Sequence, residues 1–251
     1  MYPSALLPVL LSLAIVVLAS GQAMAEEIRV AVASNFANVI KILALRFEAA
    51  SGHKVALIYG STGKHYAQIR NGAPFDAFFA ADIKRPELLE KAGFALPGSR
   101  FTYARGKIVL WSPRAGYIGA EGEVLEKGAF THLAIANPGL APYGKAAEEV
   151  LRARGLWDEL KTRVVRGENI GQAFQFVNSG NAELGFVAYS QVRWPGHPVE
   201  GSWWEVPQAL YTPVDQQAVL LKDNEVARAF LSFVKSDESR ALVREFGYAT
   251  P

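Results

Sequence analysis

The 251-residue sequence contains no cysteine. Disulfides, cysteine-ligated zinc and thiol catalysis are therefore excluded, and the core depends on hydrophobic burial. An excess of one charge is missing as well, because 26 basic and 24 acidic side chains give a formal net charge of +2. Proteins that bind nucleic acid usually carry a strongly basic surface. We therefore expect no nucleic-acid partner.

Beyond its N-terminus the sequence lacks any long apolar segment. Residues 5–20 are almost wholly apolar, and residues 23–25, Ala-Met-Ala, then precede two glutamates. This order is typical of a secretory signal peptide, residues 1–25, that is removed by cleavage after Ala25. No lysine or arginine comes before the apolar run, so only the amino terminus supplies positive charge there. An uncleaved membrane anchor is the alternative interpretation.

Several catalytic and metal-binding motifs are absent or incomplete. No Gly-x-Ser-x-Gly motif surrounds Ser34 or Ser61, which argues against an acyl hydrolase. Residues 139–146 are close to a P-loop, but they lack the serine or threonine that binds Mg²⁺, and Pro142 removes an amide. No i, i+4 pair and no carboxylate motif is formed by the four histidines, His53, His65, His132 and His197. The sequence therefore predicts no direct cation ligands and no cofactor.

What the sequence does contain is a repeated strand-to-helix junction that is rich in hydroxyl groups and bare amides and poor in charge. Four such junctions lie at residues 30–35, 58–63, 135–144 and 164–171. The first turn of each helix has unpaired N–H groups and the positive end of the helix dipole. Several such ends that converge on one point would bind an oxyanion without an arginine.

Strand and helix patterns alternate along the chain, which is typical of an α/β protein with parallel strands. We expect strands at residues 30–33, 55–59, 75–80, 107–111, 133–136, 164–165, 184–188 and 218–221. We expect helices at residues 36–47, 64–71, 86–92, 145–154, 172–178, 226–235 and 238–246. The last two helices are hard to place unless they pack back on the first part of the chain.

This order predicts two α/β domains with a ligand cleft between them. The first domain would comprise residues 26–105 with 207–251, and the second residues 106–206. Two crossings, near residues 103–106 and 206–213, would join them and act as a hinge. In open α/β sheets ligands bind beyond the carboxyl ends of the strands, so the four junctions would face each other across the cleft.

Short motifs then suggest a family. They are VASNF at 32–36, GSTGK at 60–64, YAQI at 66–69, NGAPFD at 71–76, AAD at 80–82, NP at 137–138, APYG at 141–144 and LGFV at 184–187. In these motifs and their order the chain resembles the periplasmic molybdate-binding proteins of ABC importers, which have the type II periplasmic binding protein fold. The resemblance implies a monomeric, non-enzymatic receptor in the periplasm. It would capture molybdate or tungstate and deliver the anion to a membrane permease.

The resemblance also implies which residues hold the anion, namely Ser34, Asn35, Ser61, Thr62, Tyr143 and Ile170. Ser34 would donate through its hydroxyl and its N–H, and Thr62 would supply the second hydroxyl of the Ser61-Thr62 pair. Asn35, Tyr143 and Ile170 would donate through their backbone N–H groups. Some relatives also use a tyrosine after the LGFV run. Here the aligned residue is Ala188, and Tyr189 comes one place later, so we leave Tyr189 out of the site.

Neutral donors suit a dianion that carries no proton. Each of its four oxygens accepts about two hydrogen bonds, and desolvation is costly unless most of those positions are filled. A site without acceptors would also leave the proton of hydrogen phosphate unpaired. Selection against the smaller sulfate would rest on size, so a receptor for sulfate or another small oxyanion is one alternative. An exported hydrolase that uses a serine and aspartates is the other.

Other polar and aromatic residues have simpler interpretations. Serine or threonine after a strand is a common helix N-cap. Lys64 and Lys145 follow site loops but are expected to be solvated surface charges. Asp76 and Asp82 flank a strand and are expected to cap rather than to act as acid and base. A hinge cluster, rather than a sugar platform, is expected for Trp194, Trp203, Trp204 and Tyr211.

Overall fold

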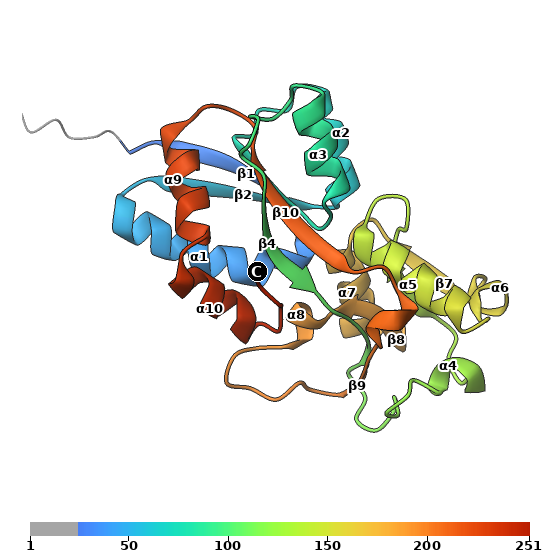
Figure 1. Cartoon of the computed structure of the whole chain (residues 1–251). Coiled ribbons are helices and arrows are strands. Elements are labelled where there is room, and N and C mark those ends of the chain that lie inside the picture. Colours follow the sequence, from blue (N-terminus) through green and yellow to red (C-terminus); the bar gives the residue numbers. More distant parts are fainter. Residues whose placement is uncertain (1–24) are drawn as a thin grey trace, which may run out of the picture.

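The computed structural model describes residues 25–251 (Figure 1). The predicted signal peptide, apart from its last residue, lies outside the described residues. Within residues 25–251, every helix is too short or too polar to span a bilayer.

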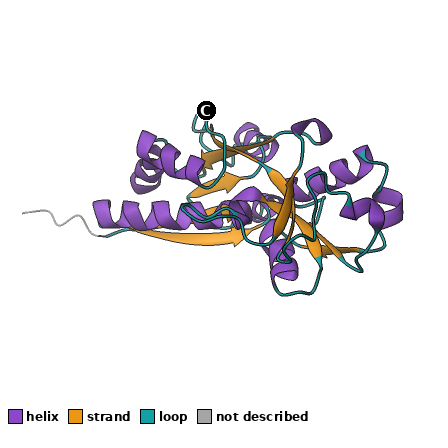
Figure 2. Ribbon diagram, turned by 90° about the horizontal axis from the view of Figure 1, so that it is seen from below, coloured by secondary structure: helices purple, strands orange, loops and turns teal. Residues whose placement is uncertain are grey.

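The described chain forms two five-stranded sheets. The first has the strand order β2-β1-β3-β10-β4, with β1 (Glu27–Ala33), β2 (Lys54–Gly60), β3 (Ala77–Ala80), β4 (Phe101–Gly106) and β10 (Val214–Leu220). The second has the order β7-β6-β8-β5-β9, with β5 (Ile108–Ser112), β6 (Leu133–Ala136), β7 (Val164–Gly167), β8 (Leu184–Ala188) and β9 (Ser202–Glu205). The predicted α/β fold with two domains is confirmed, and Figure 2 shows it by secondary structure.

The first sheet is mixed and is covered by helices on both faces. β1 pairs in parallel with β2 and β3, whereas β10 runs antiparallel to β3 and β4. One group of helices gathers beside the sheet in Figure 1 and consists of α1 (Ala37–Ser51), α9 (Glu225–Val234) and α10 (Asp237–Glu245). The other group is α2 (Thr62–Arg70) and α3 (Lys84–Lys91). α9 and α10 both contact α1, so the C-terminal helices do pack back on the first domain.

The second sheet repeats this plan. β6 is parallel to β7 and β8, and β5 is antiparallel to β8 and β9. Along β5 the side chains alternate between two cores, because Leu110 packs in the cluster that includes Val150 of α5, and Val109 in the one that includes Val177 of α7. The helices of this domain are α4 (Val124–Lys127), α5 (Pro142–Ala153), α6 (Trp157–Leu160), α7 (Ile170–Asn178) and α8 (Tyr189–Val192).

The two crossings lie close together. β4 ends at Gly106 and β5 begins at Ile108, so Lys107 makes the first crossing. The second runs over residues 206–213 and contains the 3₁₀ helix η2 (Gln208–Leu210). Residues 103–106, which we expected at a crossing, are part of β4, and residues 104–106 pair with β10. The two domain boundaries given above stay a prediction.

Candidate functional site

The four junctions meet at one small cavity between the domains. They follow β1, β2, β6 and β7, whose carboxyl ends lead into the 3₁₀ helix η1 (Ser34–Phe36), α2, α5 and α7. The structure brings together all six residues that the sequence suggested, and the cavity lining is Ala33, Ser34, Asn35, Gly60, Ser61, Thr62, Ala81, Ala141, Pro142, Tyr143, Asn169 and Ile170. The free volume is about 10 Å³, roughly one water molecule, so the domains are closed on each other.

Ser34 is the contact of the first domain with the start of α7. Ser34 directly follows Ala33, the last residue of β1, whose backbone is still extended. The backbone N–H of Gly171 donates to Ser34 Oγ at 3.1 Å. This bond uses a lone pair of the oxygen, so the hydroxyl hydrogen of Ser34 can still be donated to a ligand.

Ser61 and Thr62 have different local roles. Ser61 is the N-cap of α2, and its Oγ accepts from the N–H of Lys64 at 3.3 Å. Thr62 Oγ1 accepts from the N–H of Ala81 at 3.0 Å, which ties the loop after β3 to the start of α2. Both side chains are almost fully buried at the cavity. As with Ser34, each hydroxyl keeps its hydrogen for a further acceptor.

Tyr143 and Ile170 contribute through the starts of two helices. Ala141 and Asn169 are the extended N-caps of α5 and α7, and Asn169 Oδ1 accepts from the N–H of Gln172 at 3.1 Å. The N–H groups of Tyr143 and Ile170 lie in first helical turns, which have no acceptor within the helix. Both groups therefore suit an anion at the cavity.

The side chains of Tyr143 and Asn35 point to other partners. The Tyr143 hydroxyl oxygen accepts from Gln216 Nε2 at 3.1 Å, and Asn35 Nδ2 donates to Gln216 Oε1 at 2.8 Å. Gln216 was not among the residues that the sequence suggested. A signal was present, because Gln216 occupies the inward-facing series of β10, between the buried residues Val214 and Ala218.

The cavity lining is uncharged. None of the described residues that line it has an ionisable acid or base apart from the phenol of Tyr143. Burial raises the pKa of that phenol well above its ordinary value, so it stays neutral. Against Gly60 of the lining, His65 Nε2 lies 3.2 Å from the carbonyl oxygen of Val32, and burial lowers the pKa of this imidazole.

Polar contacts also cross between the domains beside the cavity. Gly63 N–H donates to the carbonyl oxygen of Leu140 at 2.8 Å. Lys64 Nζ lies 2.7 Å from Glu168 Oε1, with both side chains about half exposed. Lys64 is therefore a half-exposed surface charge, and its ion-pair partner belongs to the second domain. Lys145, in contrast, is exposed and pairs at 3.5 Å with Glu149 on its own helix.

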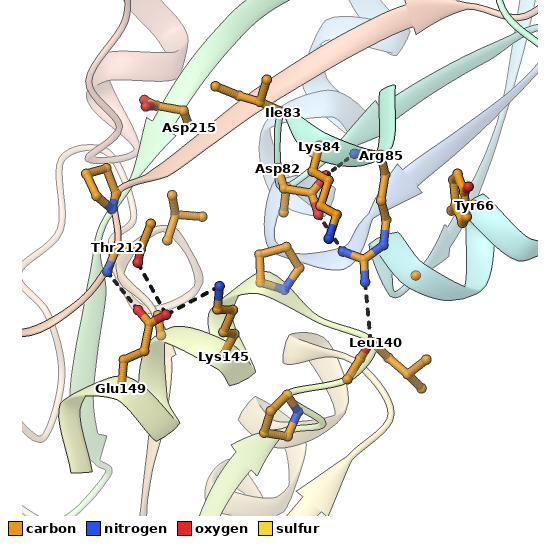
Figure 3. A pocket seen from close by; sticks show the side chains of 18 of the residues that line it. Tyr66, Asp82, Ile83, Lys84, Arg85, Leu140, Lys145, Glu149, Thr212 and Asp215 are labelled. Carbon is orange, nitrogen blue, oxygen red and sulfur yellow. Dashed lines mark hydrogen bonds and ion pairs between the residues drawn. The ribbon is translucent and has the colours of Figure 1, made fainter. Parts of the chain in front are cut away.

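A much larger groove lies next to this cavity. Its volume is about 770 Å³, and it shares Ala81 and Pro142 with the cavity lining. Figure 3 shows Arg85 joined to Asp82 and reaching the loop of the second domain, where its Nη2 lies 3.3 Å from the carbonyl oxygen of Gly139. On the opposite wall of the groove, Glu149 Oε2 accepts a hydrogen bond from the backbone N–H of Thr212 at 2.7 Å.

The remaining expectations have mixed outcomes. Asp82 Oδ1 accepts from the N–H of Arg85 and Asp76 Oδ2 from that of Arg29, so both aspartates bind backbone amides. In residues 25–251 no group of three or more histidine and carboxylate side chains is placed to hold a cation. Tyr189 lies in α8, directly after β8 ends, and its ring packs on Trp203 rather than lining the cavity.

The expected hinge cluster of Trp194, Trp203, Trp204 and Tyr211 forms only in part, because only Trp204 and Tyr211 share one core cluster. Trp194 packs against Phe246 of the first domain, and Trp204 lies under the guanidinium of Arg154 within the second. Trp203 faces Tyr189 instead. Trp203 and Trp204 lie apart because adjacent residues of β9 point to opposite faces of the sheet, and Trp194 lies outside β9.

Comparison with known proteins assigns the family. The family model of the bacterial extracellular solute-binding proteins matches residues 28–249. The chain belongs to this family. It is therefore a binding protein and not an enzyme.

Relatives and solved structures agree with this assignment. The molybdate-binding protein ModA of Azotobacter vinelandii is 51% identical over 229 residues, which are 90% of this chain and 91% of that protein. ModA of Rhodobacter capsulatus is 45% identical over 231 residues, 91% of this chain and 90% of that protein. The structure of an Azotobacter vinelandii periplasmic molybdate-binding protein superposes with a TM-score of 0.87 at 44% identity, covering 89% of this chain and 99% of that one.

Proposed function

We propose that this solute-binding protein captures molybdate or tungstate in the cavity between its domains and delivers the anion to an ABC permease. The observation that carries the proposal is the convergence of four neutral donor loops on one uncharged cavity. Two relatives that cover about nine tenths of the chain, at 51% and 45% identity, are named molybdate-binding proteins, which supports this choice of ligand.

The donors divide into hydroxyl groups and backbone amides. Ser34 and Thr62 supply hydroxyl hydrogens, with Ser61 beside them at the start of α2. The N–H groups of Asn35, Tyr143 and Ile170 complete the set. Each hydrogen bond to a charged oxygen contributes roughly 1.5–3 kcal/mol, and together they replace the water that the anion loses. The space between the loops is smaller than a tetrahedral oxyanion, so the loops have to separate slightly around it.

The same donor set explains selection by protonation state. The described lining residues include no carboxylate, and the side-chain oxygen of Asn169 already accepts from Gln172. A bound anion that keeps a proton would therefore meet no charged acceptor, and pairing that proton would turn a hydroxyl group from donor to acceptor. Molybdate and tungstate carry no proton at neutral pH, whereas hydrogen phosphate does. We infer that phosphate is rejected for this reason.

We further propose that the mature protein is a monomer in the periplasm, released by cleavage of residues 1–25. The family is extracellular, and the similar Azotobacter structure is described as periplasmic, which supports export. An exported hydrolase is disfavoured because neither serine contacts a base. Ser34 Oγ accepts a hydrogen bond from the N–H of Gly171, and Ser61 Oγ accepts one from the N–H of Lys64.

The test is isothermal titration of residues 26–251, freed of bound anion, with molybdate, tungstate, sulfate and phosphate in separate runs. We expect tight one-to-one binding of the first two and no binding of the others. Tight binding of sulfate would keep the receptor and discard its proposed substrate. If none of the four anions bound, the loops would be ordinary helix caps and the proposal would be wrong.

A further inference from the structure

Behind the cavity lies a buried polar cluster that sequence analysis did not anticipate. It consists of six side chains, each at most 5% exposed: Asn35, Tyr103, Tyr143, Ser190, Gln216 and Tyr248. We name it the Gln216 network. Tyr143 and Ser190 belong to α5 and α8 of the second domain. The other four side chains belong to η1, β4, β10 and the C-terminal segment of the first domain. The network therefore joins the two domains in their interior.

Gln216 is the centre of this network. Its Oε1 accepts from Asn35 Nδ2 at 2.8 Å and from the hydroxyl of Tyr103 at 2.9 Å. Its Nε2 donates to the hydroxyl of Tyr143 at 3.1 Å. One amide thus connects two residues whose backbone N–H groups line the cavity, one in each domain.

A second link fixes the backbone of Asn35 itself. The hydroxyl of Ser190 donates to the carbonyl oxygen of Asn35 at 3.0 Å, and the hydroxyl of Tyr248 donates to the same oxygen at 2.8 Å. Asn35 Nδ2 in turn donates to the Tyr248 oxygen at 3.0 Å. The turn that presents the Asn35 N–H is therefore held from both domains.

The network also sits at the hinge. Gln216 lies at a register shift in the pairing of β10 with β4, a β-bulge, three residues after the second crossing ends. Such bulges re-aim side chains. Gly106 ends β4 directly before the first crossing, and a Cβ there would lie 1.9 Å from the Tyr143 hydroxyl oxygen and 2.6 Å from Gln216 Nε2. The glycine therefore leaves the space that the Tyr143 phenol fills.

We propose that the Gln216 network couples domain closure to assembly of the anion site, with Gln216 and the Tyr143 phenol as positioning residues. When the domains part, water can solvate these groups. When they close, each polar atom must find its partner, because an unpaired buried group is costly. The arrangement that pairs Tyr143 with Gln216 and Ser190 with Asn35 meets this condition, because among the described residues every buried side-chain polar atom has a hydrogen-bond partner. That arrangement also aims the Asn35 and Tyr143 amides at the anion.

The inference rests on the proposed function for its ligand, and the test is Tyr143→Phe, with molybdate as the probe. This change removes the phenol oxygen and keeps the backbone N–H at the cavity. The matched control is Tyr117→Phe, because the Tyr117 hydroxyl donates to Ala129 at 2.7 Å within the second domain. Gln216→Leu and Gly106→Ala disturb the same network from the first domain and from the hinge.

We expect Tyr143→Phe to weaken molybdate binding about tenfold, through faster dissociation, and Tyr117→Phe to leave binding unchanged. We expect the cleft of the anion-free protein to open, so that water solvates the network, and the unfolding midpoint of the anion-free protein should then be the same for wild type and Tyr143→Phe. Gly106→Ala and Gln216→Leu should weaken molybdate binding at least as much as Tyr143→Phe does.

Two results would overturn the inference in different ways. If wild type binds molybdate and Tyr143→Phe and Gly106→Ala bind it equally well, or lower only the anion-free unfolding midpoint, the network is structural and the proposed function stands. If wild type binds none of the four anions, the proposed function fails and the inference fails with it.

Discussion

At the scale of single residues, the hydroxyl groups of Ser34 and Thr62 decide whether the site is assigned correctly. We predict that Ser34→Ala and Thr62→Ala each weaken molybdate binding by about 1–3 kcal/mol, because each leaves a position around a buried charge unfilled. Titration calorimetry measures the loss. Ser179→Ala is the control, since that exposed hydroxyl lies just after α7 and donates to the carbonyl oxygen of Gln175. Full affinity in both site variants would refute the assignment.

The two lysines near the site make a matched pair. Lys64 bridges to Glu168 of the other domain, whereas Lys145 pairs only along its own helix among the described residues. We predict that Lys64→Ala weakens molybdate binding by at most about 1 kcal/mol, because a half-exposed ion pair contributes little, and that the loss shrinks at high salt. Lys145→Ala should bind as wild type does. Equal losses in the two variants would instead indicate a general electrostatic effect on the anion.

His65 makes stability depend on pH. Burial lowers the pKa of its imidazole below the ordinary value of 6.5, so the unfolded chain takes up a proton more readily than the folded one. We predict that the free energy of unfolding falls as the pH drops below that ordinary value, until the folded imidazole also titrates. Denaturant melts between neutral pH and about pH 5 measure this slope. His65→Gln should make the free energy of unfolding less dependent on pH in this range. An unchanged slope would show that other titratable groups cause the dependence.

At the scale of elements, the close approach of α5 to β6 sets the position of the Tyr143 amide. A Cβ on Gly144 would lie 2.2 Å from the carbonyl oxygen of Ala136, so no side chain fits there. We predict that Gly144→Ala shifts the start of α5, weakens molybdate binding more than tenfold and lowers the unfolding midpoint. Gly139→Ala is the control in the same loop, where the nearest atom to a Cβ is 3.4 Å away. Similar behaviour of both variants would contradict the packing argument.

The elements that the sequence predicted are those with local signals. Each donor loop follows a run of apolar residues and begins a helix at a small, hydroxyl or amide residue, and such signals need no knowledge of distant contacts. β4 and β9 were missed because, among the described strands, each pairs only with a strand about 100 residues away in the sequence, β10 and β5 respectively. The Gln216 network was missed for the same reason. Gln216 and Asn35 are 181 residues apart, and their hydrogen bond exists only in the fold.

At the scale of the whole molecule, closure should depend on the anion. Because the chain has no native cysteine, thiol-reactive spin labels attach only at two introduced cysteines. Lys84 and Lys145 are exposed and line the groove from opposite domains. We predict that spin labels on a Lys84→Cys, Lys145→Cys variant lie farther apart without anion than with molybdate, and that phosphate leaves the distance at its anion-free value. The two crossings would act as the hinge for this movement of the domains. The donor loops would surround the anion only once the domains have closed. A distance that does not respond to molybdate, in a variant that still binds it, would show that the domains are closed before the anion arrives.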